Sequence, residues 1–136
     1  MGKTRSELRE IASNVLYQIY IFKNAKIDYD VNSLIKEQLE VENEFVNTLV
    51  SGVIEKQDEI NLLANKYLID WEIDRLSKVD KAILSIGIYE LLYTDTPPIV
   101  AINEALELSH KYSDDSVSKM MNAALDSLYH SEDFHE

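Results

Sequence analysis

Residues 79–92, VDKAILSIGIYELL, are apolar around almost the whole circumference of a helix. A helix that is apolar on all sides must be covered by other elements, because few of its residues can face water. A break follows at Pro97 and Pro98, and a second amphipathic segment comes after it. The sequence therefore predicts a central helix over about Ser77–Tyr93, with the rest of the chain packed around it.

The remaining residues also favour helices. The chain has only three glycines and two prolines in 136 residues, so it contains few helix breakers. Apolar residues recur at steps of three and four, which is typical of amphipathic helices. We expect one domain over 1–136, an all-α compact bundle of about seven helices, with an N-terminal helical half at about 1–70 and a C-terminal helical half at about 71–130. The other predicted helices are Thr4–Phe22, Val31–Gln38, Glu42–Glu55, Lys56–Tyr67, one beginning at Pro98, and one after Ser113–Asp115.

Four local features refine this prediction. Ser77 is expected to be the N-cap of the central helix, because Ser readily accepts a hydrogen bond from the first turn. Gly52 lies inside a helix, where it is unfavourable relative to Ala, so we expect it to allow close packing against another helix. Asp70 or a neighbour is expected to cap a short turn that ends at Arg75. The acidic tail SEDFHE is expected to be frayed.

Composition argues against catalysis, metals and membranes. The chain has no Cys, no Gly-rich phosphate loop and no nucleophile elbow, and its three His are too dispersed for a zinc site. No apolar run approaches the roughly 18 residues of a membrane span. We therefore expect a cytoplasmic protein that is not an enzyme and that uses no cofactor, metal or small-molecule substrate.

The charge is distributed unevenly. The formal net charge is −12, yet residues 1–26 carry five cationic side chains against two anionic ones. A small basic pole on an acidic body predicts two different partners, an anion at one end and a cationic protein elsewhere.

The cationic pole suggests the nature of the anion. Arg5, Arg9, Ser13 and Tyr17 follow at four-residue steps and so share one helix face. Guanidinium groups can fork onto phosphates, and a Tyr ring can stack on an unpaired base. This combination suits single-stranded RNA. The residues alone leave open a simpler interpretation, in which the arginines only form the water-exposed face of a helix.

Several short motifs occur in a characteristic order. They are Trp71, Arg75-Leu76, Ala82-Ile83-Leu84, Tyr89-Glu90-Leu91-Leu92, Pro97 and Ile102-Asn103-Glu104-Ala105. In this order and spacing the chain resembles the NusB family of bacterial transcription antitermination factors. The resemblance implies an all-α protein with two subdomains and no catalytic activity. It further implies binding to the boxA element of nascent RNA together with the ribosomal protein NusE, within an RNA polymerase antitermination complex that acts during ribosomal RNA transcription.

The resemblance also implies site residues. The positions expected to contact RNA are Lys3, Arg5, Arg9, Tyr17, Ser116, Lys119 and Met120. Those expected to contact NusE are Tyr67, Asp74, Asp80 and Glu90. This sequence departs from the family pattern at Met120, where many members have Phe, at Ala123 in place of Gly, and at Val117 in place of Ser.

The missing aromatic ring and the thin basic pole support an alternative, a protein-interaction module with little RNA affinity of its own. A third possibility is an RNA-modifying enzyme, because related helical domains are fused to methyltransferases. The sequence shows neither the strand pattern nor the Gly-rich cofactor loop that such an enzyme needs.

Overall fold

Six α-helices and one 3-10 turn form the regular structure of residues 2–135, the part of the chain that the computed structural model describes. No strand occurs among these residues, which confirms the predicted all-α class. The elements are α1 (Arg5–Ala25), α2 (Val31–Gln38), α3 (Glu44–Tyr67), η1 (Ile73–Arg75), α4 (Lys78–Tyr93), α5 (Pro98–Tyr112) and α6 (Asp115–Tyr129).

The α3 helix is continuous where the sequence analysis predicted two helices, Glu42–Glu55 and Lys56–Tyr67. It runs for 24 residues from its N-cap Asn43, whose side chain accepts a hydrogen bond from the Val46 N–H at 3.1 Å. The buried face of the first half continues into the second through Ile60 and Ala64. Neither Gly nor Pro stands at the predicted break, so nothing ends the helix there. The predicted break was wrong.

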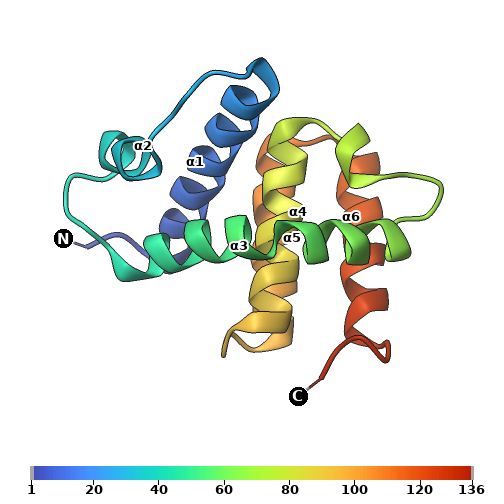
Figure 1. Ribbon diagram of the computed structural model, residues 1–136. Coiled ribbons are helices and arrows are strands. Elements are labelled where there is room, and N and C mark those ends of the chain that lie inside the picture. The colour runs from blue at the N-terminus through green and yellow to red at the C-terminus, as the bar shows by residue number, and fades with distance from the viewer. Residues whose placement is uncertain (1, 136) are drawn as a thin grey trace.

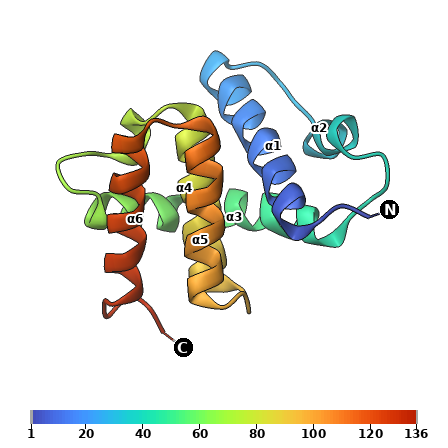
Figure 2. The ribbon, with the colours of Figure 1, turned by 180° about the vertical axis from the view of Figure 1, so that it is seen from behind.

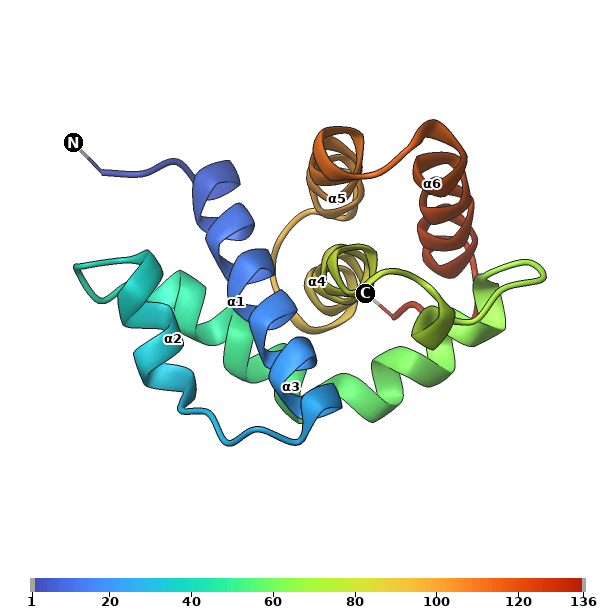
Figure 3. The same ribbon diagram turned by 90° about the horizontal axis from the view of Figure 1, so that it is seen from above.

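The predicted central helix is confirmed as α4. It packs against α1, α3, α5 and α6, and Figure 3 shows it between the N-terminal helices and the α5–α6 pair. Its side chains are buried on several sides, including Ala82, Ile83, Leu84, Ile86 and Ile88. Ser77 is the N-cap and accepts a hydrogen bond from the Asp80 N–H at 3.1 Å, as expected.

The α3 helix joins the two ends of the molecule. It contacts α1 and also α4 and α6, and both side views show it passing across the bundle (Figures 1 and 2). It lies close against α4 at Gly52, where a Cβ atom would lie 2.2 Å from the ring of Tyr89. The prediction that Gly52 permits close packing is confirmed.

Two local predictions were wrong. Asp70 does not cap the turn at η1; it has a left-handed backbone with φ of 57°, and the Asn65 side chain instead accepts a hydrogen bond from the Ile73 N–H at 2.8 Å. The tail packs against the rest of the protein as far as residue 134 and is not frayed there. The ring of Phe134 packs edge-on against Tyr129 with centroids 5.0 Å apart. Asp133 pairs with Lys66 at 2.7 Å.

Within residues 2–135, no helix is both long enough and apolar enough to cross a membrane.

Candidate nucleic-acid interface

The start of α1 is rigidly defined. Thr4 Oγ1 accepts a hydrogen bond from the Glu7 N–H at 3.1 Å, and Glu7 Oε1 accepts one from the Thr4 N–H at 2.9 Å. This capping box satisfies two of the helix's unpaired amides. The Thr4 N–H is the main cause of the lowered pKa of Glu7. Lys3 precedes this capped first turn and Arg5 begins it, and both side chains are exposed.

Arg5 lies over an aromatic ring at the edge of a groove. Its guanidinium carbon is 4.1 Å from the ring centroid of Phe45, a cation–π arrangement. The groove has a volume of about 550 Å³, and Arg9 and the Thr94–Pro97 turn also line it. No ion pair joins Arg5 to a carboxylate of the described residues. Its planar charge is available to an anion.

Arg9 has the opposite environment. Its residue is 6% exposed, and its side chain forms a two-pronged contact with Glu90, with Nε 2.5 Å from Oε1 and Nη2 2.8 Å from Oε2. Nη1 lies 3.0 Å from Glu104 Oε1. Arg9, which was expected to contact RNA, and Glu90, which was expected to contact NusE, are therefore each the buried partner of the other in this structure.

The predicted RNA-facing stripe of α1 is consequently interrupted. Ser13 is also buried, at 2% exposure, whereas Tyr17 is exposed. The reason is that α1 is covered on more than one side, by α2 and α3 and also by α4. A single apolar stripe in the sequence could not reveal this second contact.

The end of α5 lies beside the middle of α1. Lys111 Nζ is 2.8 Å from Glu10 Oε2, and Tyr112 also donates a hydrogen bond to this carboxylate. Both hydrogen bonds lower the pKa of Glu10, and the one from Lys111 contributes most. Lys111 is an exposed cation at the end of α5 that sequence reasoning missed.

The start of α6 holds the other residues expected to contact RNA. Asp114 caps the helix by accepting a hydrogen bond from the Val117 N–H at 3.1 Å. Ser116 and Met120 line a hollow of about 290 Å³ with Trp71 and Arg75. Lys119 is exposed at an adjacent depression that also includes His110.

The residues expected to contact NusE do not all lie together. Asp74 is exposed and lies 2.8 Å from Lys81 Nζ. Asp80 is 8% exposed, accepts a hydrogen bond from the Ser113 hydroxyl, and lines the same hollow as Ser116 and Met120. Tyr67 is half-buried and donates its hydroxyl proton to Asp133 of the tail. Asp80 of the predicted NusE face thus lies at the same hollow as Ser116 and Met120 of the predicted RNA face, whereas Glu90 lies against Arg9.

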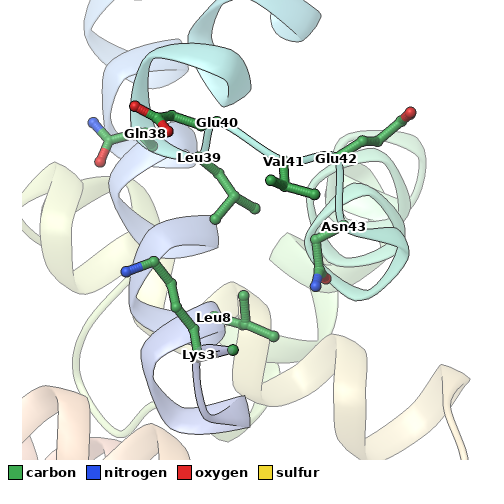
Figure 4. A pocket seen from close by; sticks show the side chains of 9 residues that line it. Lys3, Leu8, Gln38, Leu39, Glu40, Val41, Glu42 and Asn43 are labelled. Carbon is green, nitrogen blue, oxygen red and sulfur yellow. The ribbon is translucent and has the colours of Figure 1, made fainter.

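A further hollow of about 580 Å³ lies between the start of α1 and the α2–α3 connection. Lys3, Leu8, Leu39 and Val41 are among its lining residues (Figure 4). Across residues 2–135 no group of three or more His, Cys, Asp or Glu side chains could hold a metal ion. What the described surface offers is thus a set of exposed cations, aromatic rings and hollows.

Comparison with known proteins decides the family. A sequence model of the NusB family matches residues 6–130. The chain belongs to the NusB family. Its relatives include the transcription antitermination protein NusB of Bacillus subtilis, which is 36% identical over 127 residues and is aligned over 91% of this chain and 93% of its own. NusB of Macrococcus caseolyticus is 38% identical, with 92% and 95% covered.

Solved NusB structures share the fold. Thermotoga maritima NusB superposes with a TM-score of 0.79 at 28% identity, covering 93% of this chain and 90% of that one. A complex of the antitermination factors NusB and NusE with double-stranded RNA contains a chain with a TM-score of 0.78 at 26% identity, covering 93% and 96%.

Proposed function

We propose that this protein is a transcription antitermination factor that binds boxA-type RNA together with NusE during ribosomal RNA transcription. The observation that carries the proposal is the match to the NusB family over residues 6–130, joined to the likeness to a NusB that binds NusE and RNA. The proposed role is binding without catalysis, in the cytoplasm, as one component of an RNA polymerase antitermination complex.

The proposed RNA face follows α1 toward the start of α6. It begins at Lys3 and Arg5, passes the exposed Lys111 and Tyr17, and includes Ser116, Lys119 and Met120. Arg5 and Tyr17 are separated by about 18 Å along the helix axis. This length suits an extended strand of a few nucleotides, with guanidinium and ammonium groups for phosphates and an exposed ring for stacking.

The proposed NusE face comprises Tyr67, Asp74 and the rim of the hollow at Asp80. It belongs to the acidic part of the chain, since residues outside 1–26 hold 23 of the 25 carboxylates. An acidic surface attracts a basic ribosomal protein and speeds their encounter. NusE would also add positive charge that the sparse cations of this chain do not supply.

The experiment is a fluorescence anisotropy titration with boxA-type single-stranded RNA, a scrambled strand and a duplex, each with and without NusE. We expect weak binding by the chain alone and a clear preference for the boxA strand once NusE is present. Asp74→Lys should weaken NusE binding by placing like charges together, whereas the matched variant Asp58→Lys, at an exposed site on α3, should not.

The alternative is a protein-interaction module with little RNA affinity of its own. The observation that favours it is the burial of Arg9, which leaves Arg5 as the only exposed arginine on α1. If NusE binds but boxA RNA gains no affinity over the scrambled strand, this alternative replaces the RNA-binding proposal. A preference for the duplex would instead contradict single-stranded recognition.

A further inference from the structure

A charged cluster lies buried where α1, α4 and α5 meet. It contains one guanidinium, that of Arg9, and two carboxylates, those of Glu90 and Glu104. Glu90 is 1% exposed, and its two oxygens accept both prongs of the guanidinium. This fork-to-fork geometry fixes orientation as well as distance. The cluster therefore holds α1 in one position relative to α4.

The same cluster holds the turn between α4 and α5. Thr96 Oγ1 donates a hydrogen bond to Glu90 Oε2 at 2.8 Å, and Thr94 Oγ1 donates one to the Glu90 carbonyl at 2.8 Å. This turn lines the same groove as Arg5. Glu90 thus connects Arg9 on α1 to the turn that lines the groove together with Arg5.

Phe45 provides the second connection. The guanidinium carbon of Arg9 lies 5.2 Å from the Phe45 ring centroid, and that of Arg5 lies 4.1 Å from it. The ring that supports the exposed arginine therefore also packs near the buried one. A shift of Arg9 would therefore disturb both the ring and, through Glu90, the turn that lines the groove.

Arg9 is poorly placed to leave this cluster for a phosphate. Its departure would strand the Glu90 carboxylate in the interior without a counter-charge, which is strongly unfavourable. The cluster also has one more carboxylate than it has cations, so it repels a phosphate that approaches it. A direct contact with RNA would require both penalties to be overcome.

We propose that Arg9 is a positioning residue, which sets the place of Arg5 over Phe45 and the width of the groove while making no contact with RNA itself. The inference rests on the proposed RNA-binding function and deepens it by dividing the two arginines of α1 into one that binds and one that positions. It predicts that changes at Arg9 act on RNA only through Arg5.

The first test is a double-mutant cycle of Arg5→Ala and Arg9→Lys, with RNA affinity measured against salt in the presence of NusE. Lysine keeps the charge but loses the planar fork. Arg9→Lys should weaken binding by no more than the fold-change that Arg5→Ala causes, because it acts only through Arg5. The salt slope should stay unchanged, and the effect should vanish when Arg5 is already Ala.

The second test needs no RNA. In the wild type, the Phe45 ring should shift the NMR signals of the Arg5 side-chain protons upfield, and Arg9→Lys should return them toward their unstructured positions. Ile60→Val is the matched control, because it removes a buried methyl group from α3 without touching the cluster. It should leave both the Arg5 signals and the RNA affinity unchanged.

The outcomes are separable. If Arg9→Lys lowers the salt slope as Arg5→Ala does, and the two effects add, Arg9 contacts RNA and the inference is overturned. Unchanged Arg5 signals in Arg9→Lys would also overturn it. If the wild type with NusE shows no preference for boxA RNA, the proposed function fails, and the NMR comparison still decides whether Arg9 positions Arg5.

Discussion

The first turn of α1 and the turn that follows it carry one arginine each, in opposite environments. Arg5 is exposed, lies on Phe45, and has no carboxylate partner among the described residues, whereas Arg9 is buried between Glu90 and Glu104. The residue type is the same and both lie on one helix, so the difference comes from what packs against each turn. Arg5 lies on Phe45 of α3, whereas Arg9 pairs with Glu90 of α4. A cationic helix can therefore provide a binding group and a structural ion pair within one and a half turns.

The largest expected effect concerns the buried member of this pair. Glu90→Ala removes the principal partner of Arg9 and leaves a buried guanidinium short of counter-charge. We expect a loss of about 3–5 kcal/mol in the free energy of unfolding. Urea denaturation measures it, with Glu107→Ala, at an exposed position of α5, as the control. Equal stability of the two variants would show that the cluster does not stabilise the fold.

The sequence held a signal for this cluster that composition alone did not reveal. Glu90 stands in a helix that is otherwise apolar on nearly all sides, and a buried carboxylate requires a partner. The partner must be a cation on a helix that packs against α4, and Arg9 fits that requirement. Which helix meets α4 is a tertiary fact, so the amphipathic pattern of α1 could not identify the partner by itself.

Local features of the fold were more predictable because they depend on neighbours in the chain. Ser77 caps α4, and Pro98 begins α5, as the sequence indicated. The predicted break between two helices within 42–67 does not exist, because no residue at 55–56 ends the helix and α3 continues through it. The candidate site depends on contacts between distant segments, such as Glu10 with Lys111, and only the structure reveals them.

A second prediction concerns the contact between α3 and α4 at Gly52, where the two helices pack closely. Gly52→Ala would place a methyl group 2.2 Å from the Tyr89 ring, so either this ring or one of the two helices must shift. We expect a loss of about 1–3 kcal/mol in thermal or urea unfolding. Gly87→Ala is a milder comparison, since its nearest neighbour is the Ala105 Cβ at 3.1 Å. A smaller loss for Gly52→Ala than for Gly87→Ala would contradict this packing.

Tyr20, further along α1, is a buried polar residue that is neutral, in contrast to the buried and charged Arg9. Its hydroxyl donates a hydrogen bond to Gln57 Oε1 at 2.6 Å, and burial raises the pKa of Tyr20 to about 12. Tyr20→Phe should cost about 1 kcal/mol at neutral pH, the usual weight of one hydrogen bond.

The raised pKa adds a pH dependence. The unfolded chain ionises this phenol near pH 10, so the contribution of neutral Tyr20 is complete below pH 10 and is lost as pH rises toward about 12. Urea unfolding across this range should therefore show a shallower decline for Tyr20→Phe than for the wild type. Parallel declines would place the Tyr20 hydroxyl in water.

The smallest effect on stability belongs to the exposed arginine. Arg5→Ala removes one cation–π contact at the surface, and we expect a loss of only about 0.5–1 kcal/mol. Thermal unfolding beside Glu90→Ala tests the contrast directly. If Arg5→Ala destabilised the protein as much as Glu90→Ala does, the division between a binding and a structural arginine would not hold.

The most direct test of the account is the salt dependence of boxA RNA binding by the wild type, Arg5→Ala and Lys23→Ala, each saturated with NusE. Lys23 is an exposed cation at the other end of α1 and serves as the control. The account predicts that Arg5→Ala makes the slope of log affinity against log salt shallower by about 0.7, the value of one phosphate contact on a single strand. NusE affinity should stay constant, and Lys23→Ala should match the wild type. Equal slopes for all three proteins would contradict the account.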